Sequence, residues 1–271
     1  MSTVTRSSLV LALALAEAAG AAEPESATAA PSATAPSSAL LWASRGAETL
    51  RQGRWQLALF GQSHYGLADG VELALQPLVF LVLPHAEAKL RLLQRGAFTL
   101  SLRPRLSYPS PFLNLVSKEG TGGLLPATSD VPFALLFESD LVASERYATE
   151  HVASASLGLA FAPRGSSGEF PLLDFPFLYP RFAALYGVVV PRAAVSAEGR
   201  AVERLFYSVE LTAFLLPLRE FDGYALEPAI ELQYRFGPHV ALLAGVRASI
   251  ARYPVGTRFH SLPYLDVELG F

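Results

Sequence analysis

The sequence contains no cysteine, only two lysines (Lys89 and Lys118), and charged side chains at just 17% of its 271 positions. The absence of cysteine excludes a disulfide scaffold and any thiolate metal site. A formal net charge of −3 provides no basic surface for nucleic acid. Soluble domains carry about 25% charged residues, so we do not expect the whole outer surface of this protein to face water.

Long apolar runs are also missing from the body of the chain. The best stretch, residues 73–84, is about a dozen residues long and contains Gln76 and Pro77, whereas a membrane-spanning helix needs roughly 20 apolar residues. This excludes a membrane protein built from helices. The sequence has no metal-ligand spacing and no phosphate-binding loop, so we expect neither a metal nor another cofactor.

The first residues have the pattern of an export signal. Arg6 precedes the apolar run 9–16, and small residues follow through Ala22. A basic start, a short apolar core and a small-residue cleavage site are typical of a secretory signal peptide. We predict a signal peptide over residues 1–22, cleaved near Ala21 or Ala22, then a disordered Ala/Ser/Pro linker over 23–39. Residues 40–271 are predicted to form one domain.

Apolar and polar residues alternate through this domain. In the five clearest segments one face carries no charge and the other carries eight. Successive side chains of a strand point to opposite faces of a sheet, so the alternation predicts two-faced strands. The clear segments are 71–81, 98–106, 224–234, 240–250 and 263–271, and the weaker ones are 54–63, 85–93, 132–143, 150–162, 178–190 and 204–217.

Alternation alone does not say which face meets water. A soluble barrel of the lipocalin type would turn the apolar face inward, but eleven or more strands supply more Leu and Val than a small barrel holds. The polar face is mostly Ala, Gly, Ser, Thr and Gln, which is sparse for a surface in water. We therefore predict an all-β fold, a closed antiparallel transmembrane β-barrel, because only closed barrels satisfy every backbone group of a sheet in lipid.

The connections between the segments alternate in length. Those at 64–70, 94–97, 144–149 and 236–239 are short, whereas those at 107–131 and 163–177 are long and rich in Gly, Pro and Ser. Short periplasmic turns and long external loops are typical of outer-membrane barrels, as are aromatic girdles at both rims. The girdle candidates are Tyr65, Tyr147, Tyr234, Phe236 and Phe271 at the short turns and Tyr108, Phe112, Phe133, Tyr179, Tyr253 and Phe259 at the long loops.

The segments above number eleven, and an even barrel needs one more strand. If the last strand runs toward the periplasm, the missing strand is residues 40–51, which gives twelve strands, with ten or fourteen as alternatives. Prolines inside the segments each remove a hydrogen bond from the sheet, so we expect bulges or early strand ends there. These prolines are Pro77, Pro104, Pro180, Pro228 and Pro263.

The end of the chain carries a recognisable pattern. Leu265, Val267 and Leu269 alternate with polar or small residues, and the last residue is Phe271. This stretch resembles the terminal strand of Gram-negative outer-membrane β-barrels. The resemblance implies that Leu265, Val267, Leu269 and Phe271 form the signal read by the barrel assembly machinery. It also implies a location in outer-membrane lipid, and it identifies no family with a known substrate.

The charged residues of the polar face are predicted to line the lumen. One hypothesis is that cations on the fourth and fifth strands face acids on the tenth and twelfth, creating a field that orients dipolar solutes. The alternative is local pairing, for example of Arg247 with Glu231 or Asp266, which would fill the barrel as packing. The predicted lumen residues are Glu72, Lys89, Arg91, Arg103, Arg105, Glu227, Glu231, Arg247, Asp266 and Glu268.

These features favour a passive pore or small-solute transporter, monomeric or weakly oligomeric, with an unidentified solute. An outer-membrane hydrolase is one alternative, and a structural or surface-interaction role through loops 107–131 and 163–177 is another. We expect no enzyme, because only His85 and His260 fall near the outer side and spacing gives neither an Asp or Ser partner. The other histidines are His64, His151 and His239.

Overall fold

The computed structural model describes residues 42–117, 133–163, 174–186, 189–218, 221–254 and 256–271. The signal peptide and linker predicted for 1–39 therefore lie outside the described residues. The elements are β1 (Trp55–Ala58), β2 (Ser63–Ala68), β3 (Val71–Leu75), α2 (Pro77–Phe80), β4 (His85–Arg95), β5 (Phe98–Ser107), α3 (Ser110–Ser117), β6 (Leu136–Ala148), β7 (His151–Phe161), the 3-10 helix η2 (Phe182–Tyr186), β8 (Val190–Val202), β9 (Leu205–Leu218), β10 (Phe221–Arg235), β11 (Val240–Tyr253) and β12 (Gly256–Gly270).

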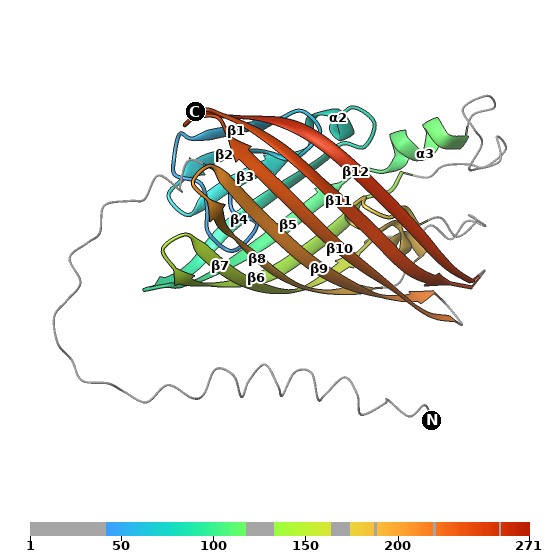
Figure 1. Ribbon diagram of the computed structural model, residues 1–271. Helices are drawn as coiled ribbons and strands as arrows, with labels where there is room; N and C mark the ends of the chain where they lie inside the picture. The colour runs from blue at the N-terminus through green and yellow to red at the C-terminus, as the bar shows by residue number, and fades with distance from the viewer. Residues whose placement is uncertain (1–41, 118–132, 164–173, 187–188, 219–220, 255) are drawn as a thin grey trace, which may run out of the picture. The chain divides into compact units, whose positions relative to one another are not determined.

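The twelve strands form one closed antiparallel barrel in which each strand pairs with its neighbours in sequence and β1 pairs with β12 (Figure 1). The predicted fold class and strand number are therefore confirmed. Among the described residues, no helix combines the length and the hydropathy that crossing a membrane requires.

The barrel is apolar outside and charged inside, as the alternation predicted. On β12 the outward Leu265 is 59% exposed, whereas the neighbouring Asp266 is 2% exposed. On β10 the outward Ile230 is 54% exposed and Glu231 is buried. A soluble barrel would show the opposite arrangement, with aliphatic side chains inside.

The two ends of the barrel differ, as predicted. At one end the chain reverses within a few residues after β2, β4, β6, β8 and β10, and Phe271 bonds there to Trp55 through both backbones at 2.9 and 3.0 Å. We call this the short-turn end. At the opposite, loop end lie the longer connections 76–84, 108–135 and 162–189.

The start of the sheet is only partly as predicted. β1 lies within the predicted strand 54–63 and β3 within 71–81, but the predicted strand 40–51 is absent from its described residues and β2 was not predicted. Residues 42–54 contain no strand, and the stretch 64–70, predicted as a turn, contains most of β2. The turn itself is only Asp69 and Gly70, and Gly70 has a positive φ of 76°. Glycine adopts that conformation without steric cost, so an Asp-Gly pair suffices to join two strands.

Two further strand predictions are wrong in position. The predicted strand 71–81 ends at Leu75, because Pro77 begins α2, where proline's missing N–H costs nothing. The predicted strand 178–190 is instead a folded segment containing η2, and β8 begins at Val190. Pro104, Pro228 and Pro263 lie within β5, β10 and β12.

The wall is much lower on one side than elsewhere. Strands β1, β2 and β3 have 4, 6 and 5 residues, whereas β8 to β12 have 13 to 15. Above these short strands, toward the loop end, lie residues 59–62 and the segment 76–84 that contains α2.

Candidate functional site

A chamber of about 760 Å³ lies inside the barrel. Small-molecule sites typically measure roughly 300–1,000 Å³, so the chamber is large enough for a solute. Its wall carries equal numbers of basic and acidic side chains. These are Arg45, Lys89, Arg103, Arg105, Arg146, Arg192, Arg235 and Arg247, and Glu48, Glu87, Glu150, Glu198, Glu210, Glu231, Asp266 and Glu268.

Residues 42–54 run along the inner wall near the short-turn end, and we call them the inner belt. The belt's backbone is bound by side chains of the wall. The amide of Arg45 donates to Glu198 at 3.0 Å, that of Ala47 to Ser144 at 2.7 Å, and that of Leu50 to Glu72 at 2.7 Å. A buried segment without secondary structure needs such partners for its backbone polar groups.

Charged side chains hold the belt as well. Lys89 donates to the carbonyl oxygens of Ser44 and Glu48 at 2.7 and 3.1 Å. Arg146 donates to the Glu48 carboxylate at 2.6 Å, and Arg45 bonds to Glu231. The belt is therefore fixed from several sides of the ring rather than resting on one strand.

A second segment, residues 174–186, folds into the loop end, and we call it the loop plug. Its 3-10 helix buries Phe182, Ala183 and Ala184 completely. Phe182 contacts Phe112 and Phe175 edge-on, with ring centroids 5.8 and 5.4 Å apart, a favoured aromatic geometry. Phe182, Ala183, Ala184 and Leu185 of the plug pack in one apolar cluster with Leu83, Leu113, Ala134, Leu136, Ala160, Val190, Phe214, Leu216, Ala225 and Ala251.

Arg181 anchors the plug to the wall although its side chain is fully buried. It forms ion pairs with Asp174 of the plug and Glu227 of β10, and it donates to the Tyr253 hydroxyl at 3.0 Å. Tyr179 also donates to Glu227. Burial raises the pKa of Tyr179, and Glu227 raises that pKa further, so the hydroxyl stays protonated and donates.

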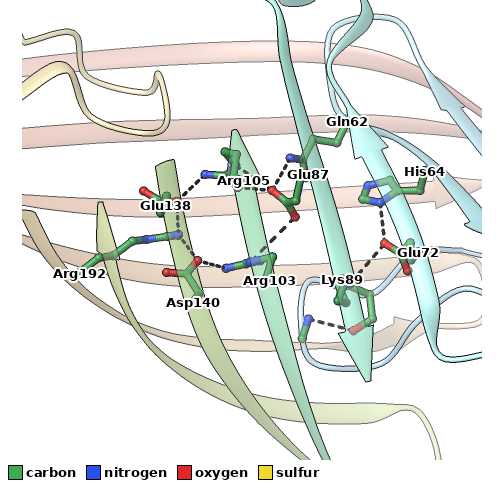
Figure 2. Close-up of polar contacts among 12 residues, drawn as sticks. Gln62, His64, Glu72, Glu87, Lys89, Arg103, Arg105, Glu138, Asp140 and Arg192 are labelled. Atoms are coloured by element: carbon green, nitrogen blue, oxygen red, sulfur yellow. Dashed lines mark hydrogen bonds and ion pairs between the residues drawn. The ribbon is translucent and has the colours of Figure 1, made fainter. Parts of the chain in front are cut away.

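Six charged side chains form a network on the chamber wall, the wall network (Figure 2). Arg105 of β5 bonds to Glu87 of β4 at 2.9 Å and to Glu138 of β6 at 2.6 Å. Arg103 bonds to Asp140 at 2.9 Å, and Arg192 bonds to Asp140 at 2.6 Å. Three cations and three carboxylates therefore alternate, which offsets part of the cost of burying charge.

The wall network crosses β7, which contributes no charge to it. Arg192 lies on β8 and Asp140 on β6, with Gly158 of β7 between them. A Cβ atom on Gly158 would lie 1.8 Å from an Asp140 oxygen. The glycine therefore leaves the space in which the Asp140 carboxylate and the Arg192 guanidinium meet.

The ten residues predicted to line the lumen fall into three groups. Seven line the chamber: Lys89, Arg103, Arg105, Glu231, Arg247, Asp266 and Glu268. Glu72 is buried against the belt and Glu227 against the plug. Arg91 lies at the short-turn rim, where it pairs with Asp69 at 2.7 Å.

The charges are paired locally rather than opposed across the lumen. Arg103 and Arg105 bind carboxylates on adjacent strands, and Arg247 approaches Glu231 at 3.4 Å. The hypothesis of a transverse field is therefore wrong, because the cations it relied on already have partners. Four residues that complete these ion pairs were not predicted from the sequence, although opposite charges on the polar faces of consecutive strands could have indicated them. They are Glu87, Glu138, Asp140 and Arg192.

Several other predicted positions need correction. Tyr179 and Phe112 belong to the interior packing rather than to a girdle, since Tyr179 stacks on Phe214 and Phe112 contacts Phe175 edge-on. Among the histidines, both ring nitrogens of His85 contact backbone atoms, of Gln76 and of Leu83. Of the proposed interaction loops, residues 118–131 and 164–173 lie outside the described residues.

Comparisons with known proteins give only distant likenesses. A scan of family models and a search of curated proteins found no match. Among solved structures, the KdgM porin in complex with disordered oligogalacturonate is 10% identical to this chain. The match covers 80% of this chain and 96% of the KdgM chain, with a TM-score of 0.43. The NanC porin is 10% identical, and the match covers 80% of this chain and 96% of NanC with a TM-score of 0.44. OccAB4 of Acinetobacter baumannii is 10% identical, and the match covers 78% of this chain and 52% of OccAB4 with a TM-score of 0.43. At these scores the likeness decides neither family nor function.

Proposed function

We propose that this chain is an outer-membrane β-barrel that passes small solutes, with the chamber as the compartment they occupy. The observation that carries the proposal is the apolar exterior around a charged, hollow interior. Such a barrel suits a lipid environment because its strands form a closed ring and its charges face inward. The role needs no catalytic group.

The proposal includes the export route. A signal peptide over 1–22, cleaved near Ala21 or Ala22, would deliver the chain across the inner membrane. The terminal residues Leu265, Val267, Leu269 and Phe271 would then be read by the barrel assembly machinery. All four side chains point outward from β12 or its end, where another protein can reach them.

The chamber has different access at the two ends. At the short-turn end it extends beside the inner belt to Thr149, Glu150 and Tyr207. At the loop end it is bounded by the loop plug, with Phe177, Leu178 and Tyr179 in its lining. Solute passage therefore depends on displacing the plug rather than the belt.

The decisive experiment is conductance of the refolded protein in planar bilayers. Arg181→Ala leaves Glu227 and Asp174 buried without their cation, which loosens the plug. We expect the variant to show severalfold more open-channel current than the wild type, and faster swelling of liposomes in small sugars.

A matched control is Arg200→Ala, which removes an ion pair with Glu150 from a half-exposed site on β8. We expect its current to equal that of the wild type. If neither Arg181→Ala nor the wild type conducts ions or passes solutes, the transport function is wrong.

A further inference from the structure

The sheet is interrupted beside β12. This strand pairs with β11 over residues 256–269, but it pairs with β1 only over residues 268–270. In the described part of the chain, no backbone hydrogen bond joins residues 256–267 to residues 59–62 or 76–84. Toward the loop end, one edge of β12 therefore has no strand beside it.

Asp266 determines how the neighbouring turn is placed. Its carboxylate accepts hydrogen bonds from the amides of Leu59 and Gly61, and from that of Phe60 at 3.1 Å. Asp266 points into the barrel, so these bonds draw the β1–β2 turn inward. The turn consequently does not extend the wall along β12.

The chamber lining extends to both sides of this interruption. It includes Phe60 and Val79 on one side and Leu262, Pro263 and Leu265 of β12 on the other. Phe60, Leu262 and Leu265 are 55%, 46% and 59% exposed, although all three line the chamber. We define the gap between the unpaired edge of β12 and residues 59–62 and 79 as the side portal.

The surroundings of the side portal are apolar. Phe60 is exposed beside it, and α2 and the residue after it expose Leu78, Phe80 and Leu81. The interior behind the portal is charged. An entrance that is apolar at its rim and polar within fits a molecule with a hydrocarbon tail and a polar head.

The groups just inside the portal indicate the charge of that head. The acids there are occupied, since Asp266 binds three amides and Glu87 binds Arg105 and Gln62. Arg247 is different, because among the described residues it pairs with one carboxylate, Glu231, at 3.4 Å, and Glu231 already accepts from Arg45 and Tyr264. Arg247 thus has donors to spare for an anion.

We propose that the side portal admits a single-chain amphiphile with an anionic head, such as a fatty acid, from the surrounding lipid into the chamber. Arg247 binds the head group, and the tail lies toward Phe60 and Leu265. The inference rests on the proposed location of the barrel in a membrane, and it deepens the proposed function by naming a class of solute.

The two tryptophans allow a direct test. Trp42 lines the chamber, whereas Trp55 is exposed on the outer face. In the variant Trp55→Phe, Trp42 is the sole tryptophan. In lipid nanodiscs, we expect dibromostearate to quench its fluorescence saturably, and brominated phosphatidylcholine in the bilayer to leave it unquenched. Equal quenching by both, or by neither, would overturn the proposal.

Blocking the side portal should abolish the signal. The chain has no cysteine, so Leu265→Cys introduced into Trp55→Phe can be labelled with a bulky maleimide. We expect the label to reduce dibromostearate quenching at least about tenfold. Ile230→Cys is the matched control, since Ile230 is similarly exposed on β10. Quenching that survives the label on residue 265 would refute entry through the portal.

The head-group assignment is tested with Arg247→Gln. Loss of a charged hydrogen-bond donor should weaken dibromostearate binding roughly tenfold, while binding of the corresponding brominated alcohol stays unchanged. An equal loss for acid and alcohol would contradict the assignment. Sugar flux through the same preparations reports separately on the proposed channel, so the two proposals fail independently.

Discussion

At the scale of single residues, the interior depends on where side chains are absent. Gly158 leaves room for Asp140, and Gly66 lies against the belt, where an added Cβ would meet the Arg51 carbonyl oxygen at 1.9 Å. Interiors this closely packed respond to a single added methyl group. Small residues on β2 and β7 are therefore as necessary to the charged interior as the charges themselves.

This gives a prediction for Gly158→Ala. The new methyl group displaces the Asp140 carboxylate and separates it from Arg192, so we expect the free energy of unfolding to fall by about 2 kcal/mol. Urea titration of the protein folded in detergent measures the change. Gly237→Ala is the control, because nothing lies within 4 Å of its added Cβ; a similar loss there would contradict the packing argument.

At the scale of elements, the belt and the plug fill the interior by different means. The plug is an apolar cluster fastened by one buried arginine, whereas the belt is held by hydrogen bonds from the wall to its backbone. Removing the buried arginine should loosen the whole plug, because that one side chain fastens the cluster to the wall. Removing one of the hydrogen bonds to the belt should lower stability only by the contribution of that bond, because the other bonds still hold the backbone. The belt should therefore be the more resistant of the two to single substitutions, apart from Lys89.

Lys89 is the exception because it bonds to two belt carbonyls and lies 3.4 Å from Glu72. Lys89→Met leaves Glu72 buried with less compensation, and we expect stability to fall by about 3 kcal/mol. Belt release should also expose Trp42 and shift its emission to the red. Arg91→Met, which removes only a rim ion pair with Asp69, should change neither. Identical behaviour of the two variants would show that Lys89 does not hold the belt.

The same elements show where sequence reasoning succeeds and where it fails. The strands β10, β11 and β12 alternate between outward apolar positions and inward positions that are mostly small, polar or charged, so the period of two identifies them. The belt has no period, because its contacts come from tertiary partners up to 186 residues away, as between Arg45 and Glu231. The plug is largely apolar apart from Asp174 and Arg181, and a short apolar run does not distinguish a strand from a packed helical turn.

Charge pairing was predicted from the sequence only as the alternative of local pairs, of which Arg247 with Glu231 is observed; the partners within the wall network were not predicted. The positions of Arg103 and Arg105 on the inner face follow from alternation, but their partners depend on register. Arg103 lies opposite Asp140 and Arg105 opposite Glu138 in the β5–β6 ladder. A shift by one residue would turn every one of these side chains to the other face, so the pairs became visible only with the fold.

At the scale of the whole molecule, the outer face should respond to charge according to depth. Ile230 lies midway along β10, and Val202 lies at the short-turn end of β8; both are well exposed. Arginine at the middle of a lipid-facing band costs about 2–4 kcal/mol, and near the interface about 0–1 kcal/mol. We expect Ile230→Arg to destabilise the barrel by the larger amount in liposomes and Val202→Arg by the smaller.

Urea titrations of folding into liposomes measure both variants. The contrast is specific to lipid, because in plain buffer an exposed arginine would be tolerated equally at either depth. Indistinguishable stabilities would therefore mean that the aliphatic face does not contact acyl chains.

The short strands beside β12 also determine where the barrel opens most easily. In the described part of the chain, β1 is joined to β12 and the terminal Phe271 through residues 55–58 alone, whereas the β9–β10 and β11–β12 ladders each extend over more than a dozen residues. The weak seam of the cylinder is therefore β1 itself, which pairs with β2 over only two residues and with β12 over three. Amide protons along that seam should exchange with deuterium first, well before those of the tall strands opposite.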